Sequence, residues 1–305
     1  MTDQLKKYLF EDRSVRVQAV RLQQAWQHAQ EHHQYPPAVQ RLLGELMAAA
    51  ALLAANIKFE GSLVLQIQGD GPIALVVVEC QSDLSLRATV KIREGRDVPA
   101  DGTMQSLLNA QGQGRFIVVL DPRRKVPGQQ AYQGIVPLEG DTVAEALQHY
   151  MKASEQLDTR LWLQADAQHA AGLLVQRLPE QGGAARSDAA ADTLARAIVL
   201  ADTLEPDELL RTDIDTLIHR LYWEETLLAF EPIPVRWHCP CTRERVAGML
   251  RTLGEREVND ILAEQGRVHV TCDFCGKPYE FDAVDCSGLF APARPMPEQD
   301  PPTVH

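Results

Sequence analysis

Five of the six cysteines fall within the last quarter of the chain, and four of them form two close pairs. Cys239 and Cys241 flank one proline in a CxC sequence, whereas Cys272 and Cys275 belong to a CxxCG sequence. In the second pair a tight turn can aim both thiolates at one point, and the glycine lets the backbone follow. Four thiolates match the tetrahedral coordination of Zn²⁺, so the spacing predicts one zinc ion held by these four residues.

The remaining cysteines and nearby histidines are not needed for such a site. His238 and His269 lie beside the two pairs, but a complete set of four thiolates leaves them no vacant position. Both are interpreted as surface or packing residues. Cys286 is interpreted as a small buried hydrophobic residue, and Cys80 stands alone in the first third of the chain.

A thiol cluster also allows redox chemistry, because a cysteine-rich cluster in a reducing compartment indicates metal binding or redox work rather than a disulfide framework. A CxC disulfide closes a very small, strained ring, which would make it reducible. A thioredoxin-like role is a weaker interpretation of residues 272–275, because they lie between two predicted strands rather than at a helix start.

Residues 1–178 are expected to form an N-terminal α+β domain with a mostly antiparallel sheet. A long helix is predicted over residues 38–58, where apolar residues repeat at helical spacing among alanines. Short turns join the strands predicted after it, and a Gly-Asp-Gly sequence at residues 69–71 marks a hairpin. Residues 170–178 fit either a strand or a short helix.

Residues 179–234 are expected to be an acidic helical linker. Between 178 and 231 there are twelve acidic and four basic residues, a net charge of −8. Repulsion between like charges should keep this segment marginally stable, although charge alone does not separate a solvated connector from one that unfolds easily. Its apolar residues need a partner surface, expected to be the N-terminal domain; they are Leu209, Leu210, Ile214, Leu217, Ile218, Leu221, Tyr222 and Trp223.

Residues 235–290 are expected to be a small zinc-binding domain, and residues 291–305 a disordered, proline-rich tail. About 55 residues bury too little core to stand alone, so zinc would supply much of the folding energy, roughly 10–16 kcal/mol for such sites. Loss of zinc on oxidation should therefore unfold the domain. Between 236 and 290 the net charge is −2, which argues against the basic footprint of a nucleic-acid-binding module.

The whole chain has 305 residues and a net charge of −12. Its longest uncharged apolar run, residues 46–55, is too short to span a membrane, and the first residues lack the apolar core of a secretory signal. We therefore expect a cytoplasmic protein that binds neither membranes nor nucleic acids. Sequence motifs of a phosphate-binding loop, a zinc protease and a serine hydrolase are absent, so we expect no enzymatic activity.

Several stretches resemble the redox-regulated heat-shock chaperone family, the 33 kDa chaperonins. They are LLGELMAAAALLAANIKFEGSLVLQIQGDGP, VVVEC, YQGIVPLEGDTVAEAL, CPCTRERVAGML and VTCDFCGKPYEFDAVD. The resemblance covers residues 1 to about 290, and the CxC…CxxC set that marks the family is complete. Cys286 departs from the family pattern, where an aliphatic residue is expected.

The resemblance implies an ATP-independent holdase that is inactive when reduced and zinc-bound. Oxidation would join Cys239 to Cys241 and Cys272 to Cys275, release zinc, unfold the C-terminal domain and loosen the linker. The active form would be a homodimer that binds unfolding client proteins under oxidative or heat stress. Two alternatives from other classes stay open: a nucleic-acid-binding protein with structural zinc, and a thiol oxidoreductase.

Overall fold

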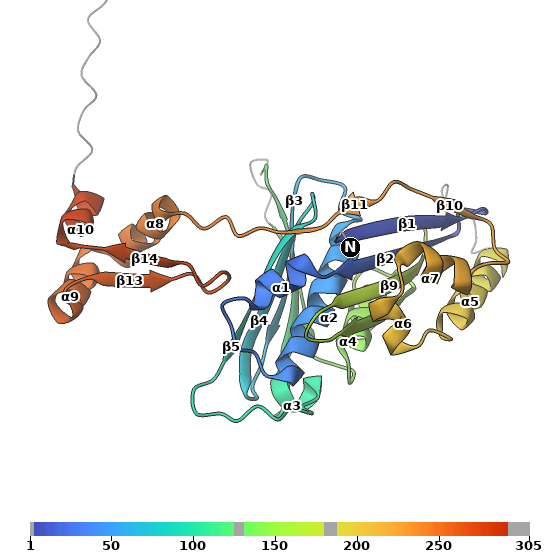
Figure 1. Ribbon diagram of the computed structural model, residues 1–305, viewed down its shortest axis with the longest axis horizontal. Helices are drawn as coiled ribbons and strands as arrows, with labels where there is room; N and C mark the ends of the chain where they lie inside the picture. The colour runs from blue at the N-terminus through green and yellow to red at the C-terminus, as the bar shows by residue number, and fades with distance from the viewer. Residues whose placement is uncertain (1–2, 125–130, 180–187, 292–305) are drawn as a thin grey trace, which may run out of the picture. The chain divides into compact units, whose positions relative to one another are not determined.

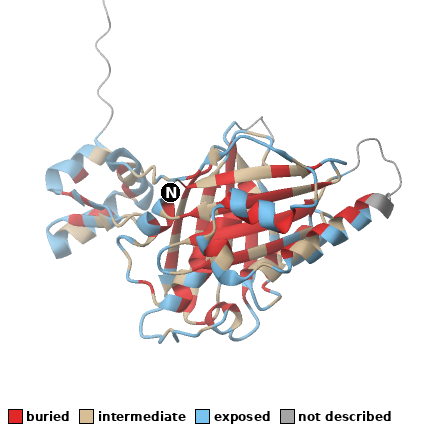
Figure 2. Cartoon of the chain, turned by 45° about the vertical axis from the view of Figure 1, so that its right-hand side comes forward, coloured by how far each residue is buried: buried red, intermediate tan, exposed pale blue. Residues whose placement is uncertain are grey.

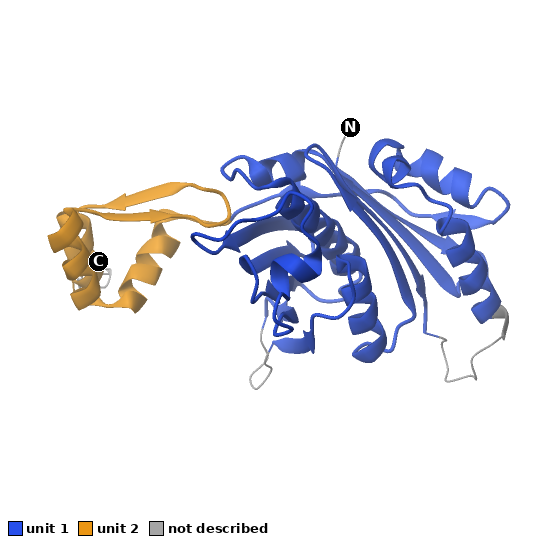
Figure 3. Ribbon diagram, turned by 90° about the horizontal axis from the view of Figure 1, so that it is seen from below, with its two compact units in different colours: residues 1–239 blue, residues 240–305 orange. Residues whose placement is uncertain are grey.

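The computed structural model describes residues 3–124, 131–179 and 188–291 (Figure 1). The chain divides into two compact units, Met1–Cys239 and Pro240–His305, which Figure 3 shows in two colours. The predicted tail lies almost entirely outside the described residues. The first unit contains both the predicted N-terminal domain and the predicted linker.

The first unit contains two sheets of six strands each rather than the single sheet that the sequence suggested. The first sheet has the order β10-β1-β2-β9-β8, with β11 also paired to β1. Its strands are antiparallel neighbours, and β2 and β9 pair along their whole length from Val15↔Arg177 to Leu22↔Ala170. The strands are β1 (Gln4–Phe10), β2 (Val15–Leu22), β8 (Thr159–Ala165), β9 (Ala170–Arg177), β10 (Leu227–Ala229) and β11 (Ile233–Pro234).

The second sheet has the order β12-β5-β4-β3-β6-β7. Its five longer strands pair antiparallel throughout, as expected. Short turns join β3 to β4, at the predicted glycine hairpin, and β4 to β5, whereas β3 and β6 pair although they are distant in sequence. The short strand β12 is the exception, because it pairs with β5 in parallel. The strands are β3 (Gly61–Gln68), β4 (Ile73–Gln81), β5 (Ser85–Ile92), β6 (Arg115–Pro122), β7 (Tyr132–Pro137) and β12 (Arg236–Trp237).

Helix α2 (Pro37–Ala54) packs against both sheets, contacting β2, β8 and β9 of the first and β3, β4 and β5 of the second. A helix covered on two sides needs small side chains, and the run of alanines at 48–51 is fully buried. A Cβ atom added at Gly44 would lie 2.5 Å from the Cβ of Ala165 on β8. The alanines and Gly44 therefore set how closely the sheet approaches the helix.

Helix α2 is also the one helix among the described residues whose length and hydropathy would suit a membrane span. However, 72% of it is buried inside the protein, as in the core helix of a globular domain.

The remaining helices of the first unit include three in the linker. These are α5 (Asp188–Ala201), α6 (Pro206–Arg211) and α7 (Ile214–Leu221). Asp213 caps the N-terminus of α7, because its carboxylate accepts a hydrogen bond from the Thr216 amide at 3.0 Å. The others are α1 (Gln24–Gln30), α3 (Met104–Leu108) and α4 (Val143–Ala153).

The second unit is small and built around a hairpin. Its elements are α8 (Arg243–Leu253), α9 (Glu255–Gln265), β13 (Val268–Thr271), β14 (Pro278–Phe281) and α10 (Ala283–Phe290). Helices α8 and α9 end at Gly254 and Gly266, both at positive φ, a backbone conformation that glycine adopts without strain. Seven buried residues form its core, so the unit has little apolar area to stabilise it.

Several elements of the structure were not predicted from the sequence. Strand β1 and helix α10 were not predicted, and the last residues of the predicted helical linker form two short strands, β10 and β11. Residues 170–177 form strand β9, which settles the choice left open there. Figure 2 shows buried residues along the strands of both sheets, whereas the helices of the first unit present buried residues on one side and exposed residues on the other. Helix α2 is the exception to this pattern.

Replacing Gly44 by valine should destabilise the first unit. The added side chain would overlap Ala165, and overpacking of a core costs about 1–3 kcal/mol in the free energy of unfolding. Chemical denaturation followed by circular dichroism measures the change. Gln40→Val on the same helix, at a half-buried surface position, is the control and should change stability by less than about 1 kcal/mol. Equal effects of both variants would contradict the close approach.

Candidate metal centre

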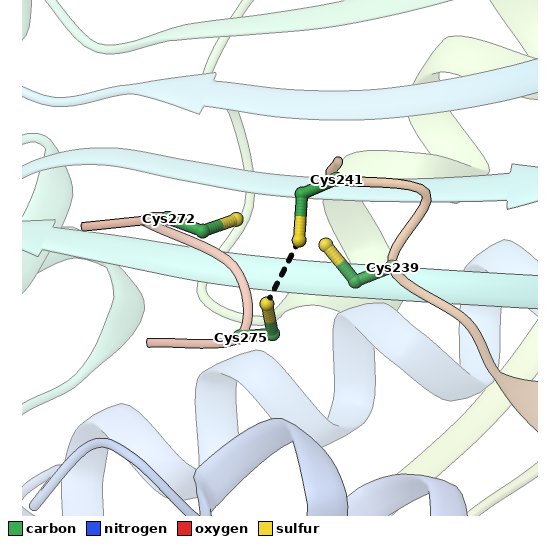
Figure 4. A group of neighbouring side chains, drawn as sticks. All are labelled: Cys239, Cys241, Cys272 and Cys275. Carbon is green, nitrogen blue, oxygen red and sulfur yellow. Dashed lines mark hydrogen bonds between the residues drawn. The ribbon is translucent and has the colours of Figure 1, made fainter. Parts of the chain in front are cut away.

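The four paired cysteines lie together in space. The sulfur atoms of Cys239, Cys241, Cys272 and Cys275 all lie within 4.8 Å of one another, and all four residues are half-buried (Figure 4). The Sγ atoms of Cys241 and Cys275 are 3.3 Å apart. The two pairs that the sequence predicted to converge on one site therefore do so, across about 30 residues of intervening chain.

Strand pairing positions the first pair. The amide of Arg236 donates to the carbonyl of Leu84 at 3.2 Å, and that of His238 donates to Leu86 at 3.0 Å. The chain is thereby fixed to the edge of β5 up to the residue before Cys239. The Arg236 guanidinium adds an ion pair with Asp83 at the same edge. The CxC sequence therefore begins from an anchored backbone rather than from a free loop.

A tight hairpin turn positions the second pair. Cys272 follows β13 directly, and its amide donates to the carbonyl of Lys277 at 3.0 Å. The Gly276 amide donates to the Cys272 carbonyl at 2.8 Å, with Gly276 at φ 63°. That left-handed conformation is accessible to glycine at no cost and turns the chain sharply. The Cys272 and Cys275 side chains are consequently directed to the same point, as the CxxCG sequence predicted.

The charge around the sulfur atoms explains why the site suits a cation. The pKa of Tyr279 on β14 is raised, first by the neighbouring Cys241 thiol, then by burial and by the negative charge of Cys241, Cys275 and Cys272. Four ionised thiols this close repel one another and a further anion, and a bound cation removes that repulsion.

Arg87 on β5 was not foreseen in the sequence analysis. Its Nε and one terminal nitrogen donate to the Glu79 carboxylate at 2.8 and 2.6 Å. Burial disfavours its charge, but Glu79 and then Cys239 raise the pKa of Arg87. A guanidinium therefore lies against the first thiol of the site. A lone arginine in an alternating strand carries no sequence signal for this contact.

The other residues considered in the sequence analysis lie elsewhere. Cys80 is fully buried in the core of the first unit, and burial raises the pKa of its thiol. Cys286 is 1% exposed within the core of the second unit, consistent with its interpretation as a small hydrophobic residue. His269 lies on β13 with Nδ1 3.4 Å from a carboxylate oxygen of Glu280. None of these three belongs to the group of converging sulfur atoms.

The linker helices cover the face of the first sheet that lies opposite α2. Their buried residues form one cluster with apolar residues of β1, β2 and β9, including Tyr8, Val17 and Leu173. The rings of Phe10 and Tyr222 meet edge to face with centroids 5.7 Å apart. The expected partner surface of the linker, the N-terminal domain, is confirmed. The prediction is wrong for one residue, Trp223, which follows the end of α7 and is 70% exposed.

Polar contacts at Asp215 fix α7 to strand β1. Its carboxylate pairs with the Lys6 ammonium and accepts a hydrogen bond from the Tyr8 hydroxyl at 2.9 Å. The hydrogen bond from Lys6 lowers the pKa of Asp215 most, opposed by partial burial and assisted by Tyr8. The linker thus carries its own electrostatic attachment to the sheet, in addition to the apolar cluster.

Comparison with known proteins shows that this chain is similar to a class of chaperones. The family model of the Hsp33 protein matches residues 3–282. A 33 kDa chaperonin of Methylobacillus flagellatus is 48% identical over 301 residues, with 98% of each chain covered. One from Chromobacterium violaceum is 45% identical, with 94% of each covered.

This chain belongs to the Hsp33 family. The crystal structure of a 33 kDa chaperonin from Thermotoga maritima shares the fold, with a TM-score of 0.77 and 23% identity over 94% of this chain and 97% of that one. The α+β fold and the chaperone class expected from the sequence are thereby confirmed. The relatives' names assign a chaperone role, which is not an enzymatic one, and membership of a chaperone family implies binding of unfolded client proteins.

Asp215→Asn should loosen the attachment of α7. A lowered folded-state pKa means that the Asp215 contribution is fully present at neutral pH and is lost as pH falls through that pKa. Because the carboxylate is largely exposed, the loss should be under about 1 kcal/mol. Hydrogen exchange of the α7 amides at pH 7 should become severalfold faster. Asp207→Asn, an exposed acid on α6, is the control and should leave α7 unchanged.

Proposed function

We propose that this protein is an ATP-independent holdase whose activity is set by the oxidation state of the four-thiol site. The observation that carries the proposal is the convergence of four sulfur atoms within 4.8 Å in a member of a chaperone family. In the proposed cycle the reduced, zinc-bound protein is inactive. Oxidation to two disulfides activates it to protect unfolding proteins from aggregation.

The donor set favours zinc as the metal. Tetrahedral coordination with Zn–S distances of about 2.3 Å places sulfur atoms about 3.8 Å apart, which suits sulfur atoms all lying within 4.8 Å of one another. Cys239, Cys241, Cys272 and Cys275 would each supply one thiolate. Four protein ligands leave no open position for a bound water, so the metal would be structural rather than catalytic. It would neutralise the thiolates and hold both pairs in place.

Oxidation would remove the ligands. In each pair two thiols lose two electrons and two protons to form one S–S bond, while one hydrogen peroxide is reduced to two waters. A disulfide sulfur carries no negative charge, so the ion would leave. The proposed pairing of Cys239 with Cys241 and of Cys272 with Cys275 rests on the family resemblance. Because all four sulfur atoms lie close together, other pairings are also within reach. Peptide mapping of the oxidised protein identifies which cysteines are joined.

Loss of the metal would unfold the second unit. Its core has seven buried residues, and a unit of this size without metal lacks the apolar burial that stabilises larger domains. The loosening would then extend to the linker, which has a net charge of −8. Undocking of α6 and α7 would uncover apolar residues of β1, β2 and β9, a surface on which an unfolding protein could bury its own apolar side chains.

The proposal also covers assembly and location. The oxidised protein would act as a homodimer, on the basis of the resemblance, and would work in the cytoplasm. Its acidic charge argues against nucleic acid as a partner, and α2, the one span-like helix among the described residues, belongs to the core. Neither nucleic acid nor membrane would therefore take part.

Reduced protein should contain one zinc per chain. Metal analysis of protein purified under reducing conditions measures this, and Cys239→Ser combined with Cys272→Ser should reduce the content to near zero because only two thiolates remain. Cys80→Ala, which removes a buried thiol of the first unit, is the control and should retain the metal. A zinc content that survives the double substitution would contradict the assigned ligands.

Oxidation, rather than ATP, should control activity. Peroxide with mild heat should increase the suppression of thermal aggregation of a model client several-fold, and a thiol reductant should reverse the increase. Hydrogen exchange should lose protection first in residues 235–290 and next in 188–230, while the remaining described residues stay protected. Equal suppression of aggregation by the reduced and the oxidised protein would contradict redox control and leave only a structural role for zinc. Turnover of a disulfide substrate would favour the thiol oxidoreductase.

A further inference from the structure

A cavity of about 210 Å³ lies in the first unit where the linker meets strand β8. Strand β8 contributes a continuous stretch of its wall, residues 161–164. The chain from Leu204 to Pro206, together with Leu209 on α6, forms another part, and Thr142 and Ala144 at the start of α4 complete it with Glu45 on α2. The cavity is therefore bordered by both the predicted N-terminal domain and the predicted linker.

Glu45 is the unusual residue of this cavity. It is half-buried on α2, a helix otherwise enclosed by apolar residues, and burial raises its pKa to about 7. Its carboxylate has no hydrogen bond or ion pair with any described residue. Arg41, one turn earlier, is the only cation that opposes the effect of burial on this pKa. Glu45 therefore offers a partly buried carboxylate whose negative charge is opposed by Arg41 alone.

Glu45 also borders a second cavity of about 210 Å³ on the other side of Thr142. There Asp101 and Asp141 face it together with Arg41. The Arg41 guanidinium donates hydrogen bonds to the carbonyls of Ala100 and Gly102, so its positive charge lies at this second cavity. The cavity beside β8 is therefore lined by Glu45 but by no arginine, because Arg41 lines only the second cavity.

The charges lining the cavity beside β8 exclude an anionic ligand. Its only ionisable lining residues are Glu45 and Glu205, and its wall contains no lysine, arginine or histidine. The two helix starts at its border are already capped. Thr142 Oγ accepts from the Glu145 amide at 3.2 Å, and the Glu208 carboxylate accepts from the Glu205 amide at 3.1 Å. One amide at each helix start is therefore already satisfied, and the two glutamates oppose an anion.

The rest of the wall suits an apolar group. Leu161, Leu163, Leu204 and Leu209 line it together with the ring of Trp162. A cation close to an indole face gains additional attraction from the ring quadrupole. The volume exceeds the roughly 150 Å³ cavity that holds a benzene molecule in an engineered protein, so a ring or short alkyl chain with one charged group fits.

We propose that this cavity binds a small organic ammonium cation with an apolar body. The ammonium group would pair with the Glu45 carboxylate, while the ring or chain would pack against Trp162 and the surrounding leucines. Glu205 would add a weaker attraction from the linker side. The site is separate from the four-thiol group and does not depend on the proposed redox cycle.

Binding there would hold the linker closed. The ligand touches α2 and β8 on one side and α6 on the other, so it binds only when α6 is docked. Mass action then stabilises the docked form by a factor of 1 + [L]/Kd, and ligand at its Kd halves the opening of α6. If the proposed function is correct, such a ligand would also delay activation, but binding itself is tested without any activity assay.

The test uses the reduced, full-length protein and phenethylammonium chloride as probe. Titration followed by the indole N–H signal of Trp162 in two-dimensional NMR should show saturable binding, with that signal assigned through Trp162→Phe. Phenethyl alcohol and phenylacetate, the neutral and anionic analogues, should bind at least about tenfold more weakly because they lack the charge that Glu45 pairs with. Equal binding of all three would show an apolar cavity only and would overturn the proposal.

Variants and pH test the role of Glu45. Glu45→Gln keeps the shape and should weaken the probe about tenfold or more, while Glu205→Gln should weaken it less. Glu139→Gln, an exposed acid outside the cavity, is the control. Since Glu45 has a pKa of about 7, the probe's affinity should also fall more than about tenfold from pH 8 to pH 5.5. Unchanged affinity in Glu45→Gln, confirmed as folded by circular dichroism, would refute the site.

Ligand-induced closure has its own readout. Saturating probe should slow hydrogen exchange of the α6 amides, such as those of Leu209 and Leu210, several-fold in the wild-type protein and not in Glu45→Gln. If the probe binds and α6 exchange does not slow, the ligand binds without bridging the two walls, and the inferred coupling is wrong.

Discussion

The apolar outer face of the first sheet needs a cover, and the linker helices supply it. Strands β2 and β9 are buried on both sides, by α2 on one and by α5–α7 on the other, and β1 adds Tyr8 and Phe10 to the face that the linker covers. The cover is itself acidic, and polar contacts attach it to the sheet, among them those of Asp215 with Lys6 and Tyr8. A large buried apolar surface is thus covered by an acidic segment, and in the proposed cycle the docking of this segment is what the four-thiol site would control.

Much of the site could be predicted because its geometry is local. A CxC sequence and a CxxCG turn each fix two sulfur atoms through a few backbone dihedrals, so spacing alone indicates the ligand set. The anchoring of Cys239 could not be predicted in the same way. It depends on parallel pairing of β12 with β5, 150 residues earlier, and on an arginine that contacts the thiol across that pairing. The hydrophobic pattern of one sequence can indicate a strand, but it does not show which distant strand pairs with it.

In the fold too, local features could be predicted from the sequence, whereas contacts between distant segments could not. The alanine-rich helix and the hairpin at the Gly-Asp-Gly sequence follow from propensity and turn chemistry, and both were foreseen. The number of sheets was not, because it depends on α2 being covered on two sides, and the pattern of one helix cannot say how many surfaces face it. Trp223 was assigned to the docked face by its apolar character and its place after α7. The chain leaves helical geometry at Tyr222, and the indole is directed into solvent instead.

Pairing of the first strand with one of the last has a consequence for how each molecule is made. Strand β1 comprises residues 4–10, but its neighbour β10 comprises 227–229 and the helices that cover it begin at 188. Synthesis proceeds at roughly 5–20 residues per second, so the sheet can form seconds before its cover leaves the ribosome. A chain whose sheet forms this early passes through a state with the outer face bare. The nascent protein is for a short time exposed to the same aggregation that the finished protein is proposed to prevent in others.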